Sequence, residues 1–187
     1  MTELLQALNS IHPLSDELRE HLFTNLKTVV LHKKEFLLKQ GQVCRSIWFI
    51  ETGLVRCFYI KEDKEVCSWF MKEGDIIISV ESFFTQMPSY ESIQALEECE
   101  LLCMDYRQLQ VIYHRFPEFN FIARVLTEKY YTLSEQRLYS LRMQRASERY
   151  TYLMDHFPEL IQRVPSTFIA SYLGITLETL SRIKHVI

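Results

Sequence analysis

The sequence predicts an α+β fold in which a β-rich first part is followed by helices. Short β-branched and aromatic runs recur roughly every ten residues between 28 and 70 and again over 92–105, with turn signals between them. This spacing is typical of an antiparallel sandwich or barrel. From Tyr106 onward the strand pattern is lost, and from Glu118 apolar residues follow helical spacing. A further pair of short helices is indicated at the end of the chain.

The elements of the first part can be taken in order. Residues 1–23 have the apolar spacing of short helices, and Ser15 stands as the N-cap of the second one. Residues 79–90 carry no clear period and are expected to be irregular. The expected strands are 28–32, 35–38, 46–50, 54–60, 66–70, 92–95 and 101–105.

The segment that follows is a long helical pattern, from Glu118 to about Ser140. Four of its apolar residues fall on a heptad-like seam that must be buried against something. A second copy of the chain is the economical partner, and packing on the chain's own barrel is the alternative. Residues 142–163 form a further helical segment. The predicted dimer-interface residues are Phe119, Ile122, Leu126 and Leu133.

The stretch from Ser166 to His185 has the pattern of a helix-turn-helix. Ala170 is small enough for two helices to cross closely, and Gly174 can adopt the left-handed backbone that the turn requires. Thr176 is placed to cap the second helix. The alternative interpretation is a small helical hairpin buried in a larger domain.

The outward residues of this stretch indicate DNA binding. In the second helix, several polar and basic side chains are not needed for the hairpin's core and project where a recognition helix meets bases and phosphates. Residues 142–187 carry a net charge of +2 and the preceding residues −5, a modest asymmetry of the expected sign. The predicted DNA-binding residues are Ser166, Thr176, Leu177, Glu178, Thr179, Ser181, Arg182 and Lys184.

Composition excludes several other classes of protein. The 187 residues carry a net charge of −3, contain no run of 18 apolar residues and begin without a basic leader, so we expect a cytoplasmic protein with no membrane contact. The five cysteines are scattered without a C-x-x-C, and the six histidines are dispersed, so no metal site is predicted. The acids Glu73, Asp75 and Glu81 lack a nearby histidine or nucleophile, so we expect no enzyme activity.

The whole chain resembles the Crp/Fnr family of bacterial transcription regulators. The resemblance rests on Gln40-Gly41, Glu51 to Arg56, Lys72 to Asp75 and Ile169 to Arg182. It implies a jelly-roll effector domain of the cyclic-nucleotide-binding type over 1–115, a dimerisation helix over 116–141 and a helix-turn-helix domain over 142–187. It also implies a homodimer that reads a palindromic operator in double-stranded DNA. No residues follow Ile187 for the family's wing, so we expect a helix-turn-helix domain that lacks a full wing.

The effector pocket departs from the members of the family that bind cyclic AMP. Glu81 matches the acid that contacts the ribose, but Glu91 stands where those members carry the phosphate-binding Arg. A carboxylate repels phosphate, and no basic residue lies between Lys72 and Arg107, so cyclic AMP binding is not expected. The pocket residues implied by the resemblance are Glu81, Ser82, Glu91 and Ser92, for an unknown small-molecule effector or for none.

The positions of the cysteines also bear on whether a cofactor is expected. The branch of the family that senses oxygen holds an iron–sulfur cluster on N-terminal cysteines, and no cysteine precedes Cys44 here, so no cofactor is expected. The alternative function is a ligand-binding or protein-interaction module with a degenerate helix-turn-helix.

Overall fold

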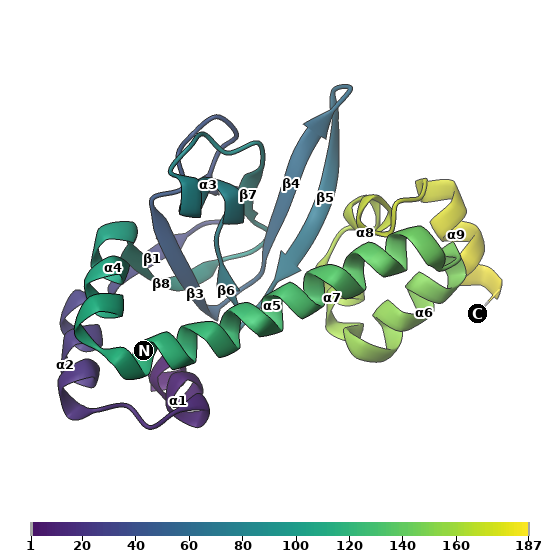
Figure 1. Ribbon diagram of the computed structural model, residues 1–187. Coiled ribbons are helices and arrows are strands. Elements are labelled where there is room, and N and C mark those ends of the chain that lie inside the picture. Colours follow the sequence, from purple (N-terminus) through teal and green to yellow (C-terminus); the bar gives the residue numbers. More distant parts are fainter. Residues whose placement is uncertain (1, 187) are drawn as a thin grey trace. The chain divides into compact units, whose positions relative to one another are not determined.

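The structure is a computed structural model that describes residues 2–186. Helices occupy both ends of the chain, and strands occupy the region between them (Figure 1). The helices are α1 Thr2–Ile11, α2 Asp16–Asn25, α3 Val80–Thr85, α4 Tyr106–Arg115, α5 Pro117–Met143, α6 Ala146–His156, α7 Pro158–Arg163, α8 Ser166–Leu173 and α9 Leu177–Val186. The strands are β1 Lys27–Leu31, β2 Phe36–Leu38, β3 Ser46–Thr52, β4 Val55–Lys61, β5 Lys64–Met71, β6 Ile76–Ile77, β7 Ser92–Ala95 and β8 Cys99–Asp105.

The strands form two four-stranded sheets, with the orders β1-β8-β3-β6 and β2-β7-β4-β5. The pairs β1–β8, β2–β7, β3–β6 and β3–β8 are antiparallel, and a register shift interrupts β3–β8 between Ile50 and Thr52. Strands that are distant in sequence are neighbours in both sheets, as the crossovers of a jelly roll require. The expected antiparallel jelly roll and α+β class are therefore confirmed.

Three elements were missing from the sequence-based prediction. The two-residue strand β6 is too short to show a period. The stretch expected to be irregular contains α3, whose N-cap is Ser79. The third is helix α4, which begins with a capping box in which the Asp105 side chain accepts from the Gln108 amide at 2.8 Å.

The single helical segment expected over 142–163 is two helices, because Pro158 begins a new one.

The chain forms two compact units, one made of residues 1–57 and 70–128 and the other of residues 58–69 and 129–187. Fully buried side chains of the first include Leu18, Ile50 and Phe83, and the core of the second includes Ile169 and Leu180. Helix α5 contributes to both units, so the expected division into 1–115, 116–141 and 142–187 stays a prediction.

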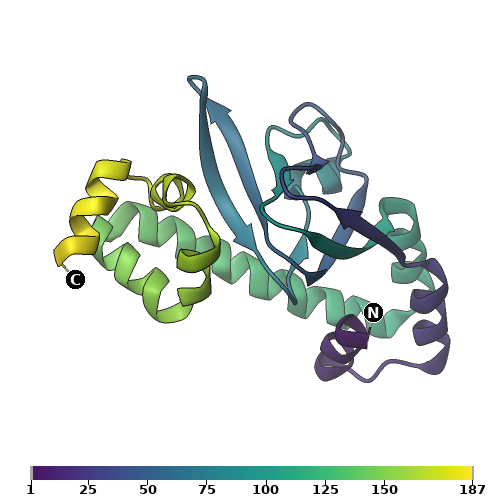
Figure 2. The ribbon, with the colours of Figure 1, turned by 180° about the vertical axis from the view of Figure 1, so that it is seen from behind.

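The outer part of the β4–β5 hairpin belongs to the second unit and lies beside α8 (Figures 1 and 2). The Ser171 hydroxyl accepts from the Cys67 amide and donates to the Glu65 carbonyl, each at 3.0 Å. A side chain of α8 thus occupies backbone hydrogen-bonding positions on β5.

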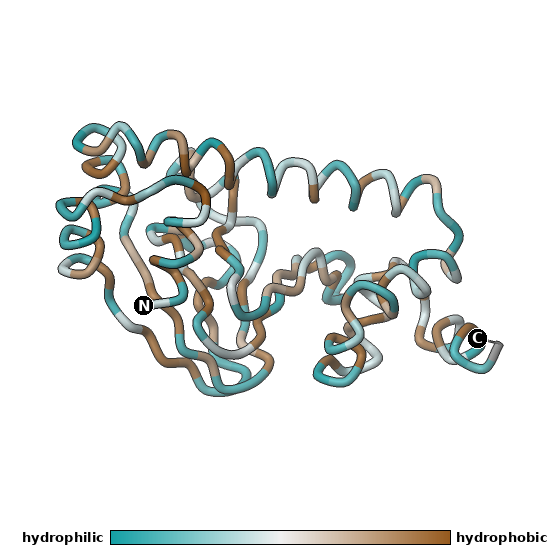
Figure 3. Tube along the Cα trace, turned by 90° about the horizontal axis from the view of Figure 1, so that it is seen from below, coloured by the Kyte–Doolittle hydropathy of each residue, from teal (hydrophilic) through white to brown (hydrophobic). Residues whose placement is uncertain are grey.

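Hydrophobic residues are interleaved with hydrophilic ones along α5, as the coloured trace shows (Figure 3). In the part of the chain that the structure describes, no helix is long and apolar enough to cross a membrane. All five thiols are free, and burial raises the pKa values of Cys44, Cys99 and Cys103 above the ordinary value for a cysteine.

Candidate effector site and nucleic-acid interface

The turn between α8 and α9 has the local geometry that the sequence predicted. Gly174 adopts a φ of 68°, in the left-handed region. The Thr176 hydroxyl accepts from the Thr179 amide at 3.2 Å and caps α9. Ala170 and Leu180 are buried where the two helices meet. Local sequence rules therefore place the start of α9.

The face of α9 that the sequence assigned to DNA is exposed. Leu177 is 45% exposed, and Glu178, Ser181, Arg182 and Lys184 are exposed as well. Hydrogen bonds to its own backbone amide and to the Thr176 hydroxyl lower the pKa of Glu178, so this carboxylate is ionised near neutral pH. The exposed surface of α9 thus carries one anionic acceptor, Glu178, and two cationic donors, Arg182 and Lys184.

Two contacts hold the basic side chains of this face in the DNA-free protein. Lys184 Nζ donates to the Ser166 hydroxyl at 3.2 Å, which links the end of α9 to the start of α8. Arg182 Nη2 donates to the Thr179 hydroxyl at 3.3 Å. Both contacts are solvent-exposed hydrogen bonds, so replacing them with contacts to phosphate or base atoms costs little free energy.

The four residues expected at a dimer seam lie in different environments. Phe119 and Ile122 are buried within their own unit, and the Phe119 ring lies 5.8 Å from that of Tyr113 on α4. Ile122 is 0% exposed, so it has no surface to offer a partner in this structure. Leu126 and Leu133 are half-buried, and their place in a dimer stays a prediction. The large exposed apolar side chains further along α5 are those of Tyr131, Leu138, Tyr139, Leu141 and Met143.

The serines expected in the effector pocket are buried and hydrogen-bonded within the chain. Ser82 Oγ accepts from the Cys44 amide at 2.9 Å and donates to the Met87 carbonyl at 2.5 Å. Ser92 Oγ accepts from the Gln40 amide at 3.0 Å. Both hydroxyls therefore hold the 40–44 turn, and their role in an effector pocket stays a prediction.

A second pair of serines, which the sequence analysis did not single out, completes this network. Ser89 Oγ donates to the Glu91 carbonyl at 2.8 Å and accepts from the Glu91 amide at 3.0 Å. It also lies 2.9 Å from Ser79 Oγ. Because the single Ser89 proton goes to Glu91, Ser79 is the donor in this contact. Polar groups around α3 are thus satisfied by one another.

The two acids of the predicted pocket differ in exposure. Glu81 is exposed on α3, whereas Glu91 is half-buried in the loop before β7. Neither position places a cation where a cyclic phosphate would need one. The contacts described above for α3 do not involve the Glu81 side chain. Its role in binding an effector stays a prediction.

Arg56 is a buried cation to which the sequence analysis assigned no role. It lies on β4 with 3% of its surface exposed, and its Nε and Nη2 donate to Gln94 Oε1 of β7 at 3.0 and 2.6 Å. Gln94 in turn donates to the Lys34 carbonyl at 3.0 Å. A charged residue inside the otherwise apolar run Leu54–Phe58 was the available signal.

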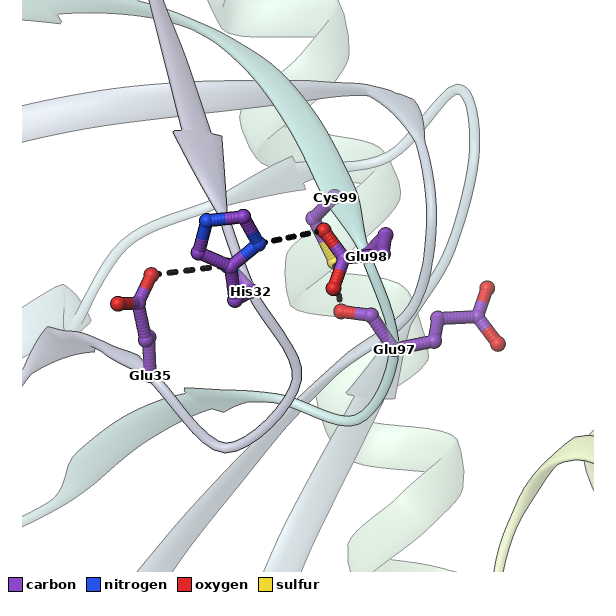
Figure 4. Close-up of polar contacts among 5 residues, drawn as sticks. All are labelled: His32, Glu35, Glu97, Glu98 and Cys99. Atoms are coloured by element: carbon purple, nitrogen blue, oxygen red, sulfur yellow. Dashed lines mark hydrogen bonds and ion pairs between the residues drawn. The ribbon is translucent and has the colours of Figure 1, made fainter.

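A solvent-exposed histidine and carboxylate pair lies at the end of β1 (Figure 4). His32 Nδ1 is 2.8 Å from Glu98 Oε2, and the His32 amide donates to Glu35 Oε2 at 2.8 Å. The hydrogen bond to Glu98 raises the pKa of His32, and the same contact lowers that of Glu98. Among residues 2–186, no group of three or more histidine, cysteine or acidic side chains could hold a metal ion.

The geometry defines a class of protein, namely a jelly-roll domain followed by a long helix and a helix-turn-helix. Comparison with protein families agrees, because the model of the cyclic nucleotide-binding domain matches residues 28–116. A search of curated protein sequences found no match to the chain.

Solved structures extend this likeness over the rest of the chain. A CooA variant from Carboxydothermus hydrogenoformans has a TM-score of 0.74 and 23% identity, with 97% of this chain and 82% of that chain covered. A regulator from Eubacterium rectale, described as a member of the Crp/Fnr family, has a TM-score of 0.71 and 14% identity, with 92% and 83% covered. The regulator CLP from Xanthomonas campestris, described as responsive to c-di-GMP, has a TM-score of 0.71 and 15% identity, with 88% and 87% covered.

Residues 28–116 therefore match the cyclic nucleotide-binding domain, and the chain has the fold of the solved Crp/Fnr regulators. This finding confirms the fold that the resemblance implied.

Proposed function

We propose that the chain is a cytoplasmic, homodimeric transcriptional regulator that binds a palindromic operator through α9. The observation that carries the proposal is the exposed polar face of α9, on a correctly capped helix-turn-helix in a chain with the Crp/Fnr fold. Glu178, Arg182 and Lys184 offer one acceptor and two cationic donors to bases and phosphates. The function is regulation through DNA binding rather than catalysis.

The individual bases follow from the side chains on this face. Glu178 can accept from a cytosine amino group, and Arg182 can donate two hydrogen bonds to a guanine or reach a phosphate. Leu177 can donate nothing and is suited to a thymine methyl group. We expect half-sites that retain a G·C pair opposite Glu178 and Arg182, with centres about one helical turn apart.

Selection of bound duplexes from random sequence tests this proposal. The purified chain should enrich a two-half-site palindrome, and enrichment of no sequence would contradict DNA recognition. Leu177→Arg should introduce a guanine preference at the position that Leu177 faces, because it supplies a bidentate donor. Ser181→Ala is the matched control on the same helix and should leave that position unchanged. An unchanged preference in Leu177→Arg would show that α9 is not docked in the expected way.

The dimer is proposed to bury the face of α5 that carries Leu126 and Leu133. Both side chains are half-buried and lie seven positions apart, so they share one face of the helix and can pack against a second copy. Leu126→Glu would place two carboxylates close together in an apolar seam. Sedimentation should then show monomers, and operator affinity should fall with dimerisation.

The effector is proposed to be a small molecule other than cyclic AMP. Glu91 supplies negative charge where the phosphate-binding Arg of cyclic-AMP-binding members stands, and the hydroxyls of Ser82 and Ser92 are already hydrogen-bonded within the chain. Titration calorimetry should show no cyclic AMP binding below about millimolar concentration. The likeness to CLP indicates that c-di-GMP is a second ligand to titrate, since that regulator is described as responsive to it.

A further inference from the structure

The last turn of α8 has an unusual way of satisfying its carbonyl groups. A helix leaves its last four carbonyls without intrahelical partners. Here the Ala170 carbonyl accepts from the Ile175 amide and the Ser171 carbonyl from the Gly174 amide, each at 3.0 Å. The next two carbonyls accept from arginine side chains of other helices. The turn that leads into α9 is therefore held partly by residues outside the helix-turn-helix.

The first of these arginines is Arg137 of α5. Its Nη2 donates to the Tyr172 carbonyl, and its guanidinium carbon lies 3.6 Å from the centroid of the Tyr172 ring. The guanidinium is therefore held at once by the backbone and by the aromatic face of one residue of α8. Residues from Lys129 onward in α5 belong to the same compact unit as α8, so this contact lies within one unit.

The second arginine is Arg149 of α6. Its Nε donates to the Leu173 carbonyl at 3.0 Å, and its Nη1 donates to the Gln144 carbonyl at 2.5 Å. Gln144 directly follows the end of α5. Arg149 thus joins the carboxyl ends of α5 and α8, where the partial negative charges of both helices favour a cation.

Burying the charged Arg137 side chain costs desolvation free energy, which a contact that only fills space would not require. Burial lowers its pKa, and Arg149 acts in the same direction. Its Nε is buried and has no hydrogen-bond partner among the described residues. A methionine could cover the Tyr172 ring without desolvating a charge, and it would be expected to pack as well or better. What a methionine cannot do is bind the Tyr172 carbonyl in a fixed direction.

We propose that Arg137 is a positioning residue for DNA recognition, which fixes the direction in which the α8–α9 turn leaves the long helix by binding the Tyr172 carbonyl and ring. This proposal rests on the proposed DNA-binding function. Recognition helix α9 begins at Leu177, three residues after Gly174, so a shift of the last turn of α8 moves every base-contacting side chain. Arg149 holds the adjacent carbonyl and supports the same position.

The first experiment compares operator affinity with affinity for a random duplex of the same length, by fluorescence anisotropy at one salt concentration. Arg137→Met should raise the Kd for the operator by about tenfold or more, because base contacts depend on the docking direction. The Kd for the random duplex should change by less than about threefold, because phosphate contacts tolerate small rotations. Arg137→Lys keeps the charge but loses the planar fork and should recover only part of the operator affinity.

Arg142→Met is the matched control, since Arg142 lies on the last turns of the same helix and is exposed. It removes one charge without touching α8 and should change both Kd values by the same small factor. Equal operator affinity in Arg137→Met and wild type would overturn the proposal. A proportional loss of both affinities, together with a lowered midpoint of thermal unfolding in Arg137→Met and Arg137→Lys, would show a merely structural role and would also overturn it.

A second measurement separates this proposal from the proposed function. Hydrogen exchange of the DNA-free protein should show faster exchange over residues 174–179 in Arg137→Met, with β3 and β8 unchanged. If the wild type selects no DNA sequence but exchange still quickens in this segment, DNA recognition fails while the holding of the turn by Arg137 stands. If exchange over 174–179 is unchanged, Arg137 does not position the turn.

Discussion

The surroundings of α3 and the outer face of α9 both carry short polar side chains, but they use them in opposite ways. Around α3, the buried hydroxyls of Ser79 and Ser89 are hydrogen-bonded to each other, and those of Ser82, Ser89 and Ser92 are hydrogen-bonded to backbone groups. On α9, Ser181 and its charged neighbours face solvent. In the first region the polar groups form hydrogen bonds within the chain, and in the second they are available to a partner.

This difference explains why a serine in a family's pocket position is weak evidence for a ligand. The Ser82 hydroxyl has a donor and an acceptor within the chain, so a ligand would have to replace both. An exposed side chain exchanges only water for a base or phosphate atom. Availability of polar groups, rather than their identity, separates the two regions.

The largest expected effect concerns the backbone near the barrel region. Gly53 has a φ of 100°, and an added Cβ would lie 2.5 Å from Cys99 Sγ and 2.6 Å from the Glu98 carbonyl oxygen. Gly53→Ala should therefore lower the free energy of unfolding of the first unit by at least about 3 kcal/mol, through strain and overlap together. Urea unfolding followed by Trp48 fluorescence in a Trp69→Phe background measures this, because Trp48 lies in the first unit and Trp69 in the second.

Gly174 is the matched control for Gly53. Its φ is 68°, but an added Cβ would meet only Leu141 Cδ2, at 3.5 Å. Gly174→Ala should lower stability by only about 1–2 kcal/mol, the strain of the left-handed backbone alone. Equal effects at the two glycines would show that the crowding at Gly53 relaxes.

A smaller effect is expected when the two kinds of serine are compared directly. Ser82→Ala leaves the buried Cys44 amide and Met87 carbonyl without this partner and should lower the free energy of unfolding by about 1–3 kcal/mol. Ser181→Ala removes an exposed hydroxyl and should stay within about 0.5 kcal/mol of wild type. Chemical denaturation of both variants provides the measurement. A neutral Ser82→Ala would mean that the network around α3 does not stabilise the fold, and the contrast with α9 would then be lost.

The smallest effect is a pH dependence at the exposed pair of His32 and Glu98. The raised pKa of His32 contributes stability that is present below its unfolded value and is lost as pH rises through the folded value. The lowered pKa of Glu98 contributes stability that is present above its unfolded value and is lost as pH falls through the folded value. The pair therefore stabilises the fold most at pH values between the pKa of Glu98 and that of His32, in mildly acidic solution. The effect is small because both side chains are exposed to solvent.

Proton NMR can check this pair residue by residue. The imidazole signal assigned by His32→Gln should titrate above the ordinary histidine value of about 6.5, and Glu98→Gln should bring it back toward that value. A His32 titration that does not respond to Glu98→Gln would remove the interaction shown in Figure 4 from solution.

Sequence reasoning succeeded where local rules decide the structure. Ser15, Gly174 and Thr176 were assigned from the chemistry of caps and turns, and each has the expected geometry. Helix α4 could also have been predicted, because Asp105 and Gln108 form a capping box ahead of an apolar period.

Other features depend on contacts between distant residues and left no local signal. Ser82 meets Cys44 across 38 positions, and Arg137 meets Tyr172 across 35. The burial of Phe119 and Ile122 has the same origin, because a heptad-like period does not distinguish a partner helix from the chain's own core.

The most direct test of the contrast between the two regions is one titration, the affinity of the chain for its selected operator with and without about 1 mM cyclic AMP. We expect operator binding at least about a thousandfold tighter than binding to random duplex. We also expect the same Kd in both solutions. An operator affinity no better than that for random duplex, or a Kd that cyclic AMP shifts by about tenfold or more, would contradict the proposed contrast between the two regions.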